Sequence, residues 1–163
     1  MASHTPFGSN SFALVAKGLV AIHAMIRAGT DESAEAEAIR DSLDAPHKTL
    51  TPTERYRAQW LSEDLYSISD PPDPDRPKEL NSQAQQQLLD ALEAREDRDR
   101  DRVLLLLRQV RKSLPPALLS HLRGSIWSES GHPEVAAEFH RHASERAPLN
   151  EDYRATYLDG RAN

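Results

Sequence analysis

Three histidines stand close together near the C-terminal end of the chain, in the segment GHPEVAAEFHRHASERAP of residues 131–148. An imidazole can bind a metal ion or act as a general base near neutral pH, so His132, His140 and His142 are the first candidates for chemistry. Two zinc ligands on one helix need a spacing of four residues, whereas His140 and His142 are two residues apart and project about 200° from each other. His132 precedes the predicted helix and faces another direction. The spacing therefore predicts no metal site, and histidines at the borders of an apolar helix face are typical packing residues.

Two other groups of residues could support catalysis. His23 shares the apolar face of a predicted N-terminal helix, and a buried imidazole needs a hydrogen-bond partner, for which Asp64 is the candidate. Asp41, Asp44 and His47 lie close together in the segment RDSLDAPHK. Either group would make the protein a small helical enzyme with a general base. A satisfied core pair and a helix end followed by a turn are the simpler interpretations, because no glycine-rich phosphate loop or recognisable nucleophile accompanies them.

The composition excludes several classes of chemistry. The chain of 163 residues has no cysteine, so disulfides, cysteine-ligated zinc and thiol nucleophiles are excluded. Lys and Arg number 20 against 26 Asp and Glu, which gives a net charge of −6. Nucleic-acid binding relies on clustered basic side chains, so we expect no nucleic-acid partner, and no sequence feature indicates a cofactor.

The first apolar segment, SFALVAKGLVAIHAMIRAG, begins at residue 11, where a signal peptide or membrane anchor could stand. No Lys or Arg precedes it, whereas Lys17, His23 and Arg27 interrupt it. It matches neither pattern, so we expect a cytoplasmic protein without membrane association.

Apolar residues recur at spacings of three and four along the chain, which predicts an all-α fold. Residues 1–10 are expected to be a flexible N-terminus, and residues 11–68 a helical module. Three helices are predicted there, over residues 11–28, from the segment TDES to about Asp44, and from the segment TPTE to about Ile68. In TPTE, Thr51 can cap the helix, Pro52 suits its first position and Glu54 completes a capping box.

A proline-rich segment, SDPPDPDRPKE, covers residues 69–79. Closely spaced prolines favour an extended, semi-rigid chain, so the segment is predicted to link the N-terminal module to residues 80–163. A long loop inside one domain is the alternative that the sequence leaves open.

The second part of the chain contains a repeat at an offset of 33 residues. Small or β-branched residues and a terminating proline recur in the same order: Val103, Val110 and Pro115 align with Ala136, Ala143 and Pro148. Periods of about 20–50 residues are typical of stacked helical hairpins.

Residues 117–150 resemble a tetratricopeptide repeat. Small, aromatic, turn and terminating positions of the family pattern are occupied by Gly124, Trp127, Gly131, Ala136, Phe139, Ala143 and Pro148. Ser120 and Arg123 depart from the pattern, because the family prefers large apolar residues there. In the weaker first copy, residues 84–116, Arg98 stands where a turn glycine belongs. The final segment, NEDYRATYLDG, is expected to form a closing helix.

The resemblance implies a short α-solenoid of stacked hairpins that serves as a protein-interaction or assembly module for a peptide or helical protein partner. First helices of each hairpin line the concave side in the family, which implies partner contacts through Ser120, Arg123, Trp127 and Tyr153. A place for Trp127 in the core is the alternative. Two alternatives remain: the small helical enzyme described above and a structural homo-oligomer.

Overall fold

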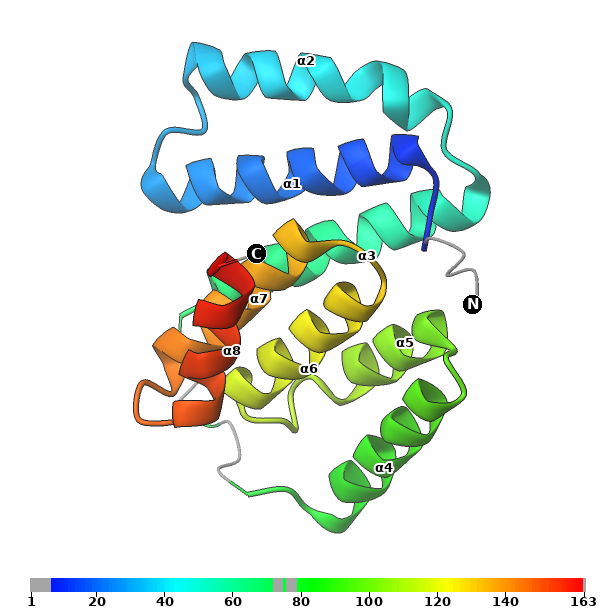
Figure 1. Ribbon diagram of the computed structural model, residues 1–163, viewed down its shortest axis with the longest axis vertical. Helices are drawn as coiled ribbons and strands as arrows, with labels where there is room; N and C mark the ends of the chain where they lie inside the picture. Colours follow the sequence, from blue (N-terminus) through cyan, green and yellow to red (C-terminus); the bar gives the residue numbers. More distant parts are fainter. Residues whose placement is uncertain (1–6, 72–74, 76–78, 163) are drawn as a thin grey trace. The chain divides into compact units, whose positions relative to one another are not determined.

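The structure is a computed structural model that describes residues 7–71, 75 and 79–162, and in this part it contains eight α-helices and no strand (Figure 1). The all-α prediction is therefore confirmed. The helices are α1 (Asn10–Ala28), α2 (Ala34–Lys48), α3 (Pro52–Ile68), α4 (Ser82–Glu96), α5 (Arg100–Val110), α6 (Pro116–Glu129), α7 (Pro133–Arg146) and α8 (Glu151–Ala162).

The chain divides into two compact units, Met1–Pro71 and Pro72–Asn163, which we call unit 1 and unit 2. The division falls inside the proline-rich segment predicted as a linker, residues 69–79. Residues 72–74 and 76–78 of that segment lie outside the described residues, as do residues 1–6 of the predicted flexible N-terminus.

In unit 1, α1 packs against both α2 and α3 and lies between them (Figure 1). The core on α1 includes Phe12 and Val15, and α3 supplies Leu61 and Leu65. The contribution of α2 is small, because Ala36 is its one buried residue. Unit 1 is thus a three-helix module organised around α1.

Side-chain caps stabilise the beginnings of α1 and α3 in unit 1. Thr51 and Glu54 form the predicted capping box, with hydrogen bonds of 3.2 Å from the Glu54 N–H to Thr51 and 2.9 Å from the Thr51 N–H to the Glu54 carboxylate. The same carboxylate accepts a hydrogen bond of 2.7 Å from the N–H of Ser9, which caps α1. Burial raises the pKa of Glu54, but the hydrogen bonds from Thr51 and Ser9 outweigh it and leave the pKa below its usual value. Glu54 therefore joins the beginnings of α1 and α3.

The predicted end of the second helix at Asp44 is wrong, because α2 continues through Pro46 to Lys48. A proline inside a helix removes one backbone hydrogen bond, and near the C-terminal end few further bonds depend on it. The packed part of unit 1 also begins earlier than residue 11: Phe7 is buried, and the guanidinium of Arg57 lies 3.9 Å from the centre of its ring.

In unit 2 each helix packs against the next along the chain. The helices α4 and α5 form one hairpin, α6 and α7 form a second, and α8 lies against α7 (Figure 1).

The two hairpins have the same turn, 33 residues apart. The N–H of Asp99 donates to the carbonyl of Ala94 at 3.0 Å, and the N–H of His132 donates to the carbonyl of Trp127 at 3.0 Å. The residues that precede these two donors are also 33 positions apart: Arg98 has φ 59° and Gly131 has φ 84°. Both turns therefore use one residue in the left-handed conformation, and the first hairpin places an arginine there.

Replacing Arg98 with glycine is expected to raise the free energy of unfolding of unit 2 by about 1 kcal/mol, because a side chain is disfavoured at this φ. The midpoint of urea unfolding measures the effect. Gly131→Ala is the matched control: a Cβ there has no neighbour within 4 Å, so the change in φ preference alone should destabilise the unit by a similar amount. A lower midpoint for Arg98→Gly would contradict the argument.

Candidate functional site

The buried polar side chains described in unit 2 all belong to the α6–α7 hairpin. They are Ser120, Arg123, Ser130, His132, Glu138, His140 and His142. The close approach of α7 to α6 depends on Gly124, since a Cβ at this position would lie 2.6 Å from Cε1 and 2.7 Å from Nδ1 of His140. The small residue of α6 therefore provides the space that the His140 ring occupies.

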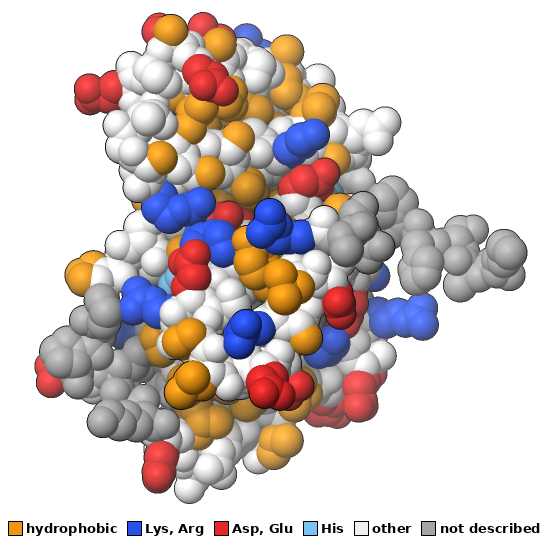
Figure 2. All heavy atoms as spheres, turned by 60° about the vertical axis from the view of Figure 1, so that its left-hand side comes forward, with side chains coloured by type: hydrophobic (Ala, Val, Ile, Leu, Met, Phe, Trp, Pro, Cys, Tyr) orange, Lys and Arg blue, Asp and Glu red, His pale blue; other side chains and the backbone are white. Residues whose placement is uncertain are grey.

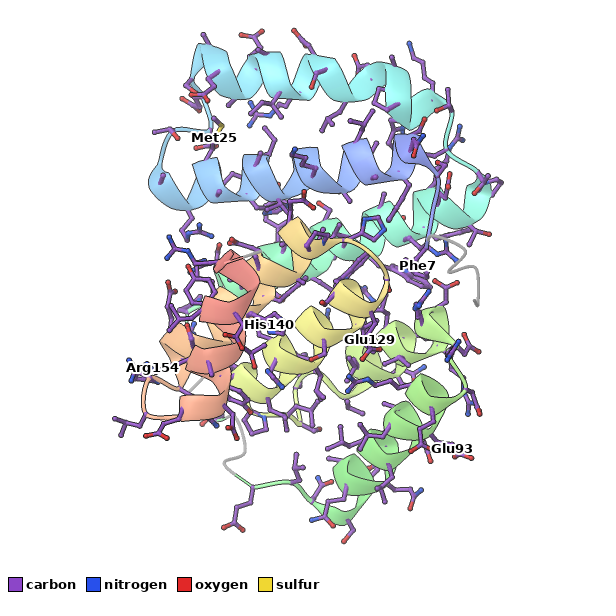
Figure 3. All side chains as sticks on the ribbon, viewed as in Figure 1. Phe7, Met25, Glu93, Glu129, His140 and Arg154 are labelled. Atoms are coloured by element: carbon purple, nitrogen blue, oxygen red, sulfur yellow. The ribbon has the colours of Figure 1, made fainter. Side chains whose placement is uncertain are left out.

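Three aromatic side chains from three helices form what we call the histidine row: His140 of α7, His121 of α6 and Tyr153 of α8. Ring centres are 5.5 Å apart between His140 and His121, and 4.7 Å apart between His121 and Tyr153. Figure 3 labels His140, which is 6% exposed. The Nδ1 atoms of His121 and His140 are both buried without a hydrogen-bond partner among the described residues.

Both imidazoles of the row are held in the neutral form. Burial, assisted by the neighbouring His121, lowers the pKa of His140 to about 4. Burial also lowers the pKa of His121, assisted by the positive charge of Arg95 and opposed by the carboxylate of Asp152. A proton on Nδ1 of either ring would therefore lie at a buried atom that has no hydrogen-bond partner among the described residues to compensate its charge.

His142 approaches α6 on the other side of the hairpin. Its Nδ1 lies 2.6 Å from the hydroxyl oxygen of Ser120, and its Nε2 accepts a hydrogen bond of 3.2 Å from Nε of Arg146. Because the arginine can only donate, Nε2 carries no proton, so the neutral ring is protonated at Nδ1 and donates to Ser120. Burial lowers the pKa of His142 to about 4, and Arg146 and Arg141 contribute to the same shift.

The Ser120–His142 pair has the residue types of a nucleophile and its base. Its proton, however, is on the histidine nitrogen that would have to accept the serine proton in catalysis. A general base must offer a lone pair to the serine hydroxyl. Here the nitrogen that faces Ser120 already holds its proton, and both side chains are buried, 3% and 7% exposed. The pair therefore acts as a hydrogen bond between α6 and α7.

The structure explains why the three histidines of the opening segment do not converge. His140 contacts Gly124, His142 contacts Ser120, and the ring of His132 meets Trp127 edge-on with ring centres 5.6 Å apart. Among the described residues, no group of three or more His, Asp or Glu side chains is placed to hold a metal ion.

Three of the four predicted partner-binding residues are buried. Ser120, Arg123 and Trp127 are 3%, 2% and 1% exposed, and only Tyr153 is half-buried. The Arg123 guanidinium lies 6.0 Å from the ring centre of Phe139 on α7. Partner binding through these residues stays a prediction, and in this conformation a partner reaches only Tyr153 directly.

The candidate catalytic groups of unit 1 are placed differently from each other. His23 and Asp64 are buried, 5% and 2% exposed, and the His23 ring meets Tyr66 of α3 edge-on with ring centres 4.2 Å apart. Asp41, Asp44 and His47 are all exposed on α2. A general-base role for either group stays a prediction.

His121 was not singled out in the sequence, because its contacts join residues that are distant along the chain.

A search of protein families, curated proteins and solved structures found no match. Among the described residues, α1 is the one helix that is long and apolar enough to span a membrane, a property that core helices share. The cytoplasmic location stays a prediction.

Proposed function

We propose that the protein is a protein-interaction or assembly module of the tetratricopeptide type, whose partner is a peptide or a helical segment of another protein. The observation that supports the proposal is the repeated hairpin: α4–α5 and α6–α7 have the same turn, with equivalent hydrogen bonds 33 residues apart. Stacked hairpins of this kind present extended surfaces to partners rather than reactive groups.

The surface we assign to the partner is on α4, where Leu89 and Leu92 are 58% and 39% exposed. We call these two residues the exposed leucine pair. The opposite side of α4 is occupied by the buried row of Ala84, Ala91 and Ala94, and the helix packs mainly against α5. Leucines on a regular helix are the side chains that a helical partner buries in a hydrophobic groove or interface.

The face of the molecule in Figure 2 shows hydrophobic side chains exposed between Lys, Arg, Asp and Glu side chains. Single apolar side chains between charged ones are common on protein surfaces, so the assignment of the partner surface rests on the exposed leucine pair.

Affinity purification of the full chain from its native cells, with partners identified by mass spectrometry, tests the proposal. The purified partner is then titrated against two double variants of unit 2. Leu89→Asp with Leu92→Asp is expected to weaken binding by at least about tenfold, because it places two charges at the contact. Leu105→Asp with Leu158→Asp makes the same change at exposed leucines of α5 and α8, and it should bind like the unchanged chain.

A purification that contains only the protein itself contradicts the proposal. Light scattering then distinguishes the alternatives. A defined dimer or higher oligomer supports the structural homo-oligomer, whereas a monomer contradicts both the interaction module and the homo-oligomer. Equal binding by both pairs of variants would move the contact away from the exposed leucine pair.

A further inference from the structure

We propose that protonation of the histidine row in mild acid releases α8 from the α6–α7 hairpin, while the hairpin itself stays folded. The proposal concerns a conformational change within unit 2 and does not depend on the partner described above.

The row is the contact through which α8 meets a ring of α6. His121 lies between the other two rings, at 5.5 Å from His140 and 4.7 Å from Tyr153, with interplanar angles of 53° and 31°. Tyr153 near the N-terminal end of α8 is therefore placed against the ring of His121, which in turn meets the ring of His140. Two imidazolium ions at this separation would repel each other, and each would need a hydrogen-bond acceptor for its Nδ1.

The buried nitrogen atoms explain why protonation requires movement. Nδ1 of His140 and Nδ1 of His121 have no hydrogen-bond partner among the described residues. The ring of His140 is also fixed from the other side, because the backbone of Gly124 leaves no more space than the ring occupies. His121 and Tyr153 are both half-buried, whereas His140 is buried, so the row meets solvent on the side where Tyr153 lies, and movement of Tyr153 opens that side further to water.

Of the helices in unit 2, α8 is the least firmly held. None of its described side chains is fully buried, and Tyr153 and Tyr157 are only half-buried. The α6–α7 hairpin, in contrast, encloses Trp127, Phe139 and Ala143, which are 1%, 0% and 0% exposed. Elements with few buried contacts open before the core does, so release of α8 is the opening of lowest free energy.

The charged groups around the row act in both directions. Arg95 of α4, which is ion-paired to Glu129 of α6, opposes protonation of His121. Asp152 of α8 favours it and would attract the protonated ring. Asp152 is exposed, so solvent screens its attraction, whereas His140 is almost fully buried and its charge is not screened. The free-energy cost of a charge on buried His140 therefore outweighs the attraction of Asp152, so protonation favours the release of α8.

Hydrogen exchange measured by mass spectrometry on the full chain between pH 7 and pH 4.5 tests the proposal, with rates corrected for the intrinsic effect of pH. If release restores the ordinary pKa of His140, protection of α8 should fall by up to roughly 80-fold at pH 4.5. Peptides from α6 and α7 should keep their protection. Loss of protection in all three helices together would overturn the proposal.

Two variants remove the titrating groups separately. His121→Phe keeps a ring against Tyr153, and His140→Leu keeps an apolar side chain against Gly124; each should reduce the pH dependence of α8. If one variant fails to fold, the other decides. His142→Gln is the control, because His142 is equally buried but contacts Ser120 outside the row, so α8 should still be released. An unchanged pH dependence in the two row variants would overturn the proposal.

Discussion

Replacing Gly124 with valine is expected to lower the free energy of unfolding of unit 2 by about 3 kcal/mol, at the upper end of the usual cost of overpacking a core. A Cβ at this position would lie 2.6 Å from Cε1 of His140, closer than carbon atoms approach in a packed interior. His140 is 6% exposed, so its ring has little space into which it can move. Urea unfolding at pH 8, where His140 and His142 are neutral, measures the loss.

Two controls separate steric collision from other effects of removing a glycine. Gly160→Ala in α8 adds a Cβ with no neighbour within 4 Å, so it should be neutral or stabilise by up to about 1 kcal/mol through helix propensity. In a His140→Ala chain the ring is absent, and Gly124→Val should then cost much less. Additive losses in the double variant would show that the two side chains do not compete for the same space.

Local rules predicted the beginnings and ends of helices that depend on neighbouring residues. The predicted Thr51–Glu54 capping box is present, because a cap is a contact within one turn of chain. The end of α2 was missed because Pro46 is compatible with the last turn of a helix. The left-handed Arg98 was visible only as the residue aligned with Gly131, since an arginine gives no local turn signal.

The site was less predictable than the helices. Helical spacing placed His140 and His142 on opposite borders of one helix face, and the structure shows them contacting α6 at Gly124 and Ser120 respectively. Spacing could not show that His121 and Tyr153 extend the contact of His140, because those residues lie on other helices. Nor could it show that Arg123 is buried, because an isolated arginine in a sequence indicates an exposed position.

Between pH 8 and pH 5, His142 is expected to lower the free energy of unfolding of unit 2 by about 2 kcal/mol. Its pKa is about 4 in the folded chain and about 6.5, the ordinary value of histidine, in an unfolded one. As the pH falls below 6.5, the unfolded chain binds the proton first and is stabilised by it. The stability contributed by the neutral ring is therefore complete above pH 6.5 and is lost progressively as the pH falls towards 4.

Fluorescence of Trp127 in a Trp60→Phe chain follows unfolding of unit 2, since Trp60 is the other tryptophan and belongs to α3. His142→Gln removes the titrating group but keeps an oxygen that can accept from Arg146, so its stability should fall by about 2 kcal/mol less over the same pH range. His140 titrates in both chains, which makes the difference specific to His142. His47→Gln is the control for the substitution itself, because it changes a residue of unit 1 and not of the unit that Trp127 reports. Equal slopes for His142→Gln and the unchanged chain would mean that His142 can be protonated in place, and that Arg146 does not fix its tautomer.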